Sequence, residues 1–142
     1  YTTEDTLSLH DALPIFGLRH GAIASTVAHD AHNIIVAGVT DEDMLAAVRA
    51  VIDNGGGFAT VKNGAVCAAV PLPIAGLMSV QPVQKVVEQH RRLLAATAAL
   101  GSTLANPFMT LSFLALTPIP ALKLTDRGLF DATRFAMTTL AA

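Results

Sequence analysis

The sequence contains no tryptophan, a single cysteine and few charged residues, and each shortage limits what the chain can be. Because Cys67 is alone, the chain cannot form an internal disulfide, and the apolar run around this thiol predicts a small buried side chain in a reducing compartment, the cytoplasm. Charged residues make up 14% of the chain, against roughly 25% in average soluble proteins. The net charge of −2 leaves no basic patch for a nucleic acid. With 52% apolar residues, the chain is expected to bury surface against a partner.

The longest stretch without a charged residue runs between Arg92 and Lys123. This stretch exceeds the roughly 20 residues that a membrane-spanning helix needs. Helix-breaking residues nevertheless divide it into short pieces, namely Gly101, Asn106, Pro107, Pro118 and Pro120. We therefore expect no membrane span.

The first fifteen residues are set aside from the fold prediction. Residues 6–15 are what results when the bases ACTCTTTCCCTACACGACGCTCTTCCGATC, a common short-read sequencing adapter, are translated in frame. We expect residues 1–15 to be an adapter-derived, non-native segment and native sequence to begin at about Phe16, within a longer polypeptide. A native disordered N-terminus is the alternative, and finding the same codons in intact genomic DNA would establish it.

The remaining residues, 16–142, suffice for one domain of typical size. Residues 20–28 are small and apolar, and residues 33–38 are apolar without alternation, which predicts two buried strands joined by a polar connection. Thr40, followed by three acidic residues, predicts a capped amphipathic helix that ends at the glycines of residues 55–57.

The second half of the chain begins with a hairpin signal, Asn63-Gly64, between two short apolar runs. A proline-rich irregular segment, residues 71–79, then leads to a second long helix that ends at Gly101. Residues 108–116 fit either a strand or a buried helix, and a short strand is expected at about residues 135–140. Together these elements predict an α/β (α+β) fold: a single mixed-sheet domain with two long helices.

Side chains that could carry chemistry are concentrated in the connection after the first strand. His29, Asp30, His32 and Asn33 lie within five consecutive positions of a chain that has only five histidines. Such groups can titrate, ligate a metal or form several hydrogen bonds. In an extended strand His29 and His32 would point to opposite faces, so a shared role requires a turn here.

Three segments in order resemble the C-terminal region of bacterial adenine deaminases, of the amidohydrolase superfamily. They are His29-Asp-Ala-His-Asn33 after a small apolar strand, Pro-Leu-Pro-Ile-Ala-Gly-Leu-Met-Ser at residues 71–79, and Leu-Ala-Leu-Thr-Pro-Ile-Pro-Ala-Leu-Lys-Leu-Thr-Asp-Arg-Gly-Leu at residues 114–129. The resemblance covers residues 16–140. Ala31 stands where the family has serine, and Ala121 stands where it has glutamate. The first change removes one hydroxyl hydrogen bond from the polar connection.

The resemblance implies that the chain is the C-terminal domain of a larger metal-dependent hydrolase of purine salvage and adenine catabolism, which converts adenine and water to hypoxanthine and ammonia. In such enzymes a divalent ion (manganese, iron or zinc) lowers the pKa of a bound water to about 7. This chain has no His-x-His pair and is shorter than a barrel of about 250 residues. We expect the metal and the catalytic residues in an N-terminal barrel of the same polypeptide, and the isolated chain to be inactive. The expected partners are that barrel, a purine substrate and other copies in a homo-oligomer.

For the polar connection, our hypothesis is that His29, Asp30, His32 and Asn33 border the mouth of the barrel's active site. There they would help to close the site or order a water. The alternative is a purely structural turn, in which Asp30 fixes a histidine tautomer and Asn33 caps a backbone group. For the whole chain, the alternative is a free-standing, non-catalytic binding or oligomerisation module of the same fold.

Overall fold

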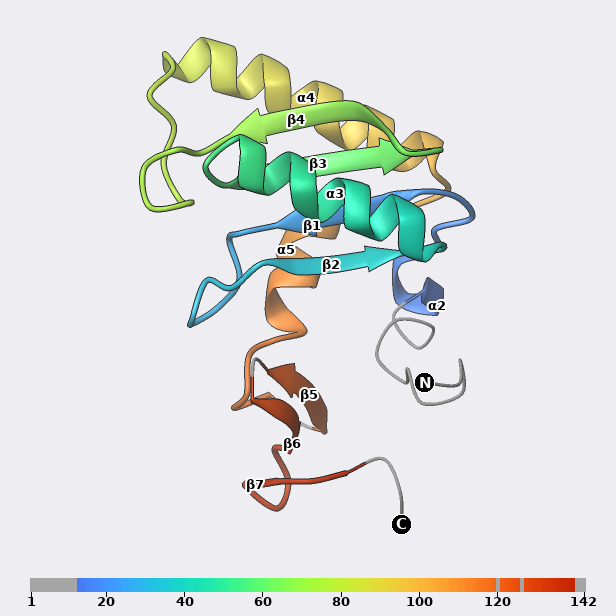
Figure 1. The fold of residues 1–142 in the computed structure, drawn as a ribbon, viewed down its shortest axis with the longest axis vertical. Coiled ribbons are helices and arrows are strands. Elements are labelled where there is room, and N and C mark those ends of the chain that lie inside the picture. Colours follow the sequence, from blue (N-terminus) through green and yellow to red (C-terminus); the bar gives the residue numbers. More distant parts are fainter. Residues whose placement is uncertain (1–12, 120, 126, 140–142) are drawn as a thin grey trace.

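The computed structural model describes residues 13–119, 121–125 and 127–139 of the chain. It contains a four-stranded sheet flanked by helices and a three-stranded sheet near the C-terminus (Figure 1). Helices and antiparallel sheets in one small domain confirm the predicted α+β class. Of the segment 1–15, residues 1–12 lie outside the described residues, and residues 13–15 belong to a short helix, α2 (Leu13–Phe16).

The main sheet has the order β2-β1-β3-β4, and each neighbouring pair is antiparallel. Its strands are β1 (Ala22–Ser25), β2 (Ile35–Gly38), β3 (Gly57–Lys62) and β4 (Ala65–Pro71). The turn between β3 and β4 consists of Asn63 and Gly64, with φ angles of +53° and +73°. Positive φ at both central residues is what a type I′ hairpin turn requires, so the predicted hairpin is confirmed.

Helix α3 (Asp41–Asp53) covers one face of this sheet and lies in front of it in Figure 1. The Thr40 hydroxyl accepts a hydrogen bond from the backbone N–H of Asp43 at 3.3 Å, which confirms the predicted cap. Three acidic residues in the first turn add a favourable interaction with the positive end of the helix dipole.

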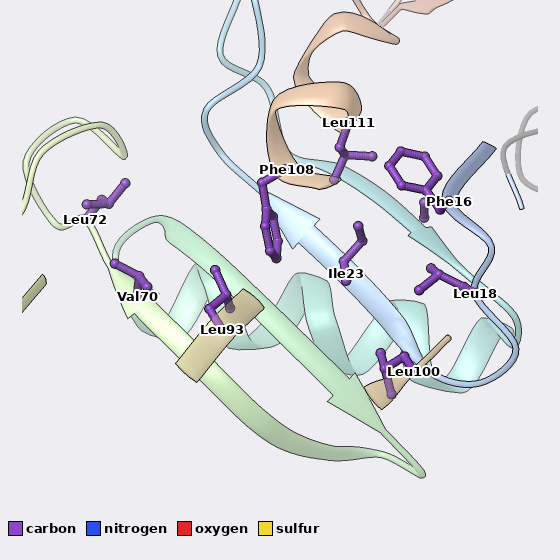
Figure 2. Packing of buried hydrophobic residues seen from close by; sticks show 10 residues of the cluster. Phe16, Leu18, Ile23, Val70, Leu72, Leu93, Leu100, Phe108 and Leu111 are labelled. Atoms are coloured by element: carbon purple, nitrogen blue, oxygen red, sulfur yellow. The ribbon is translucent and has the colours of Figure 1, made fainter. Parts of the chain in front are cut away.

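Helices α4 (Val83–Ala99) and α5 (Pro107–Phe113) cover the opposite face. Helix α4 packs over β3 and β4, whereas α5 packs over β1 and β2. Figure 2 shows the buried side chains that meet between them: Ile23, Val70, Leu93, Phe108 and Leu111. Full burial of each such side chain contributes about 1.5–3 kcal/mol. No helix among the described residues is long and apolar enough to cross a membrane.

Strand β1 is apolar from Ala22 to Ala24 because both of its faces are buried. Ala22 and Ala24 pack in the cluster under α3, whereas Ile23 packs in the cluster under α4 and α5. Successive side chains of a strand alternate between the two faces of a sheet. Because helices cover both faces, both sets of side chains must be apolar.

The second sheet is an antiparallel meander of β5 (Leu122–Thr125), β6 (Gly128–Asp131) and β7 (Ala136–Met137). It lies beyond the end of α5 (Figure 1). Strand β7 falls within the strand expected at about residues 135–140, although residue 140 lies outside the described residues. Helix α5 covers residues 108–113 of the ambiguous segment 108–116, and the pair β5 and β6 was not predicted.

One prediction of burial is wrong, and the error comes from an edge strand. Cys67 is exposed, because β4 is an edge strand and its first three residues have little cover from the helices. Strand β2 is the other edge, and Ile35 and Val36 are only partly buried, but they pack against the clusters on opposite faces of the sheet, as expected for this strand. An apolar run in the sequence does not reveal whether a strand lies at the centre or at the edge of its sheet.

Candidate functional site

The candidate site is the loop of residues 26–34, which joins β1 to β2 at one end of the main sheet (Figure 1). Thr26 fixes the start of this loop. Its buried hydroxyl accepts a hydrogen bond from the backbone N–H of Gly57 at 2.7 Å and donates one to the carbonyl of Gly76 at 2.6 Å. One threonine therefore ties the loop, the start of β3 and the segment 71–79 together.

Two glycines allow these segments to approach one another. A Cβ atom on Gly56 would lie 2.4 Å from Cα of Gly76, which no real structure tolerates. A Cβ atom on Gly76 would lie 3.1 Å from Oγ1 of Thr26, and the φ of Gly76 is +73°. Glycine is required at position 56 for steric reasons, whereas at position 76 it is favoured by the positive φ and by the close approach of Thr26. The sequence places these glycines in two separate segments, and nothing local indicates that the two segments meet.

The histidines lie on a tight turn further along the loop. The backbone N–H of His32 donates a hydrogen bond to the carbonyl of Ala28 at 2.7 Å, which closes the turn. His32 itself has a φ of +52°, in the left-handed region. The turn brings the rings of His29 and His32 to a centroid distance of 5.8 Å, with an angle of 63° between their planes. The turn that a shared role requires is therefore present.

A third ring joins this pair from helix α5. The ring centroid of Phe113 lies 5.4 Å from that of His29, with an angle of 31° between the planes. Sequence reasoning missed Phe113, because residues 108–116 fitted either a strand or a helix and the direction of each side chain was therefore undetermined. Nδ1 of His32 is buried and has no hydrogen-bond partner among the described residues. A buried ring nitrogen without a partner is unusual in a folded protein.

Asp30 and Asn33 complete the predicted set, and both are exposed. Neither side chain forms a hydrogen bond within the part of the chain that the structure describes. The two side-chain contacts of the structural alternative are thus absent among the described residues, whereas its hydrogen-bonded turn is present, so both readings of the loop stay predictions. Exposed polar side chains on a loop that rigid elements hold in place are available to a group outside the domain.

The loop does not by itself form a metal centre. Within residues 13–119, 121–125 and 127–139, no three His, Cys, Asp or Glu side chains come together as a possible metal site. His29 and His32 provide at most two ligands, whereas a catalytic zinc site typically uses three protein ligands. The described residues thus do not fit the divalent ion that the family resemblance implies.

The fold and the loop together define an α+β domain that presents polar and aromatic side chains at one end of its main sheet. The model of one protein family, the adenine deaminase C-terminal domain, matches residues 12–136. The chain belongs to this family.

Curated adenine deaminases resemble the chain over most of its length. It is 54% identical over 125 residues to the adenine deaminase of Desulfatibacillum aliphaticivorans, and 56% identical over 124 residues to that of Syntrophobacter fumaroxidans. The adenine deaminase of Methanothrix thermoacetophila is 53% identical over 125 residues. These alignments cover 87% to 88% of the chain but only 22% of each relative. The chain thus spans about a fifth of the length of the curated relatives it matches.

Proposed function

We propose that this chain is the C-terminal domain of an adenine deaminase, in which the loop of residues 26–34 borders the active site. The observation that carries the proposal is that the rings of His29, His32 and Phe113 gather at one end of the main sheet in a chain of this family. The deaminase reaction would replace the exocyclic amino group of adenine by oxygen from water, giving hypoxanthine and ammonia. A divalent ion, manganese, iron or zinc, would be held by the rest of the polypeptide.

The chemistry of the loop suits a purine and its surroundings. A purine has flat aromatic faces and nitrogen atoms along its edge, so it can stack on aromatic rings and form hydrogen bonds with imidazole nitrogens. His29 is only partly buried, and the side chains of Asp30 and Asn33 are exposed and form no hydrogen bond among the described residues. The loop can therefore limit the access of bulk water to a substrate and supply polar contacts at the same time. This role needs no metal ligand from the chain itself.

The test uses a full-length enzyme in which residues 16–136 replace the matching region of the Desulfatibacillum aliphaticivorans relative. His29→Ala and His32→Ala should each lower kcat/KM for adenine by about tenfold, which corresponds to roughly 1.4 kcal/mol of transition-state stabilisation. Metal content should stay unchanged. His20→Ala is the matched control, because His20 is exposed and precedes β1, at the opposite end of the strand from the loop.

Equal values of kcat/KM for all three variants would show that the loop has no part in the reaction. A loss of bound metal in His29→Ala would instead mean that the loop contributes a ligand to the metal centre. An unsubstituted chimaera that binds metal but does not deaminate adenine would contradict the proposed function as a whole.

A further inference from the structure

An open groove lies on the face of the domain that α4 covers, next to the candidate loop. It encloses about 490 Å³ between the first half of α4 and the segment that follows β4. Most of its lining is apolar, from Val27, Phe58, Leu72, Leu77, Val86 and Val87. His90 and Arg91 lie at its polar side. Arg91 has no ion pair within the described part of the chain.

Large exposed apolar side chains continue this surface around the groove. They lie in the segment between β4 and α4 and on the first turns of α4, and their exposed fractions range from 43% to 67%: Ile74, Met78, Val80, Val83 and Val87. Single exposed apolar residues are ordinary, whereas a contiguous group marks an interaction site. We call these five residues, together with the groove lining, the groove face.

The groove face is held in a fixed shape. Ile74 and Met78 exchange two backbone hydrogen bonds, of 3.2 and 3.1 Å. The N–H of Leu72 donates to the carbonyl of Gly56 at 3.0 Å, and Thr26 holds Gly76. A partner that binds here does not have to order a loop first, which lowers the entropy cost of binding.

The groove face and the candidate loop lie at the same end of the main sheet (Figure 1). Val27 lines the groove only two residues before His29. Figure 1 shows the segment between β4 and α4 and the connection between β1 and β2 at the same end of the sheet. A partner seated in the groove would therefore also reach the rings of the candidate site.

We propose that the groove face is the docking surface for the remaining, N-terminal part of the adenine deaminase polypeptide; this inference rests on the proposed function. More than three quarters of each curated relative lies outside the region that the chain matches, and the family is that of a C-terminal domain. The occupant is an apolar surface of that part, with a carboxylate facing Arg91. Apolar cores with arginine at their edges are typical of protein interfaces.

Oxidation of Met78 tests the proposal in the chimaera described above. Methionine reacts with hydrogen peroxide according to its exposure, and Met78 is 57% exposed in the domain alone. We expect the native chimaera to protect Met78 from sulfoxide formation, relative to the same protein unfolded in denaturant, as measured by peptide mass spectrometry. Oxidation of Met78 at the unfolded rate would overturn the proposal, and no substitution is needed for this result.

Two matched variants test whether the protection of Met78 comes from contacts on the groove face. Val87→Glu places a carboxylate on the groove face, four residues before Arg91, whereas Leu45→Glu places one on the outer side of α3, four residues before Arg49. Both original side chains are about half exposed. We expect loss of Met78 protection in Val87→Glu and full protection in Leu45→Glu. Equal protection in both variants would overturn the proposal.

The effect of dilution on Met78 protection and the deaminase activity of the chimaera distinguish the remaining explanations. Protection that disappears on dilution would assign the groove face to a second copy of the chain, and would overturn the proposed occupant. An active chimaera with unprotected Met78 would contradict the docking surface while leaving the proposed function intact. An inactive chimaera with protected Met78 would support the docking surface and contradict the proposed function.

Discussion

The carboxylate of Asp43 in helix α3 accepts a hydrogen bond of 2.6 Å from the backbone N–H of Gly64, in the turn between β3 and β4. Asp43 is only 4% exposed, although aspartate is almost never buried without a partner. The third residue of a helix thus caps a hairpin turn twenty-one residues later in the chain. This contact fixes the start of α3 to the tip of the hairpin.

Removal of this contact should destabilise the domain. Asp43→Ala leaves the N–H of Gly64 without its partner and takes an acidic group from the first helical turn, so we expect a loss of about 1–3 kcal/mol in the free energy of unfolding. Urea unfolding followed by circular dichroism measures it. Asp41→Ala is the control, because Asp41 lies in the same turn but is exposed. Equal losses in both variants would mean that the bond to Gly64 contributes nothing.

A buried pair of hydroxyls joins β3 to α4, and the pair is not symmetrical. Oγ1 of Thr97 lies 2.8 Å from Oγ1 of Thr60 and 2.9 Å from the carbonyl of Leu93. Thr97 has one hydroxyl proton, which the carbonyl requires, so the proton between the two hydroxyls comes from Thr60. Thr97→Val therefore leaves a buried donor without an acceptor, whereas Thr60→Val leaves Thr97 bonded to Leu93.

We expect Thr97→Val to lower the free energy of unfolding by about 1–3 kcal/mol and Thr60→Val to lower it by less. In the double variant both hydroxyls are gone, so its loss should be smaller than the sum of the single losses. A urea unfolding cycle of the four proteins provides the comparison. Strict additivity would contradict the hydrogen bond between the two side chains.

Local signals in the sequence predicted those parts of the fold that depend on neighbouring residues. Asn63-Gly64 predicted the hairpin because both residues readily adopt positive φ, and Thr40 predicted the start of α3 because its hydroxyl reaches a backbone N–H three residues later. The polar set of His29 to Asn33 was found in the same way, from its composition alone.

The sequence could not predict the parts that depend on distant segments. The contact between His29 and Phe113, and the hydrogen bond from Thr26 to Gly76, join positions that only the folded sheet brings together. The burial of Cys67 was predicted wrongly for the same reason, because its exposure depends on the position of β4 at the sheet edge. Periodicity describes one segment at a time and does not give its neighbours.

The exposure of Cys67 can be tested directly. A thiol on the surface of an edge strand should react with Ellman's reagent in the native chain about as fast as in the unfolded chain, within roughly tenfold, because access and thiolate fraction determine the rate. The release of thionitrobenzoate measures both rates. A native rate that rises steeply with added denaturant would show that the thiol is buried and that β4 is covered.

Gly76 and Gly64 form a matched pair that isolates the contact holding the candidate loop. Both have a φ of +73°, but a Cβ atom on Gly64 would meet nothing within 4 Å, whereas one on Gly76 would press against Thr26. Alanine costs roughly 1–2 kcal/mol in this backbone conformation at either position. Gly76→Ala should cost about 1–2 kcal/mol more than Gly64→Ala, because it also displaces the hydroxyl that bonds to the carbonyl of Gly76 and the N–H of Gly57.

Urea unfolding of the two alanine variants gives the difference. Hydrogen exchange adds a local measurement: the amide of Gly57, which donates to Thr26, should exchange faster in Gly76→Ala and at the original rate in Gly64→Ala. Identical stabilities together with an unchanged Gly57 amide would mean that the three segments can separate without cost. In that case the loop that carries His29 and His32 would not be anchored by Thr26, and its shape would have to come from the contact with Phe113.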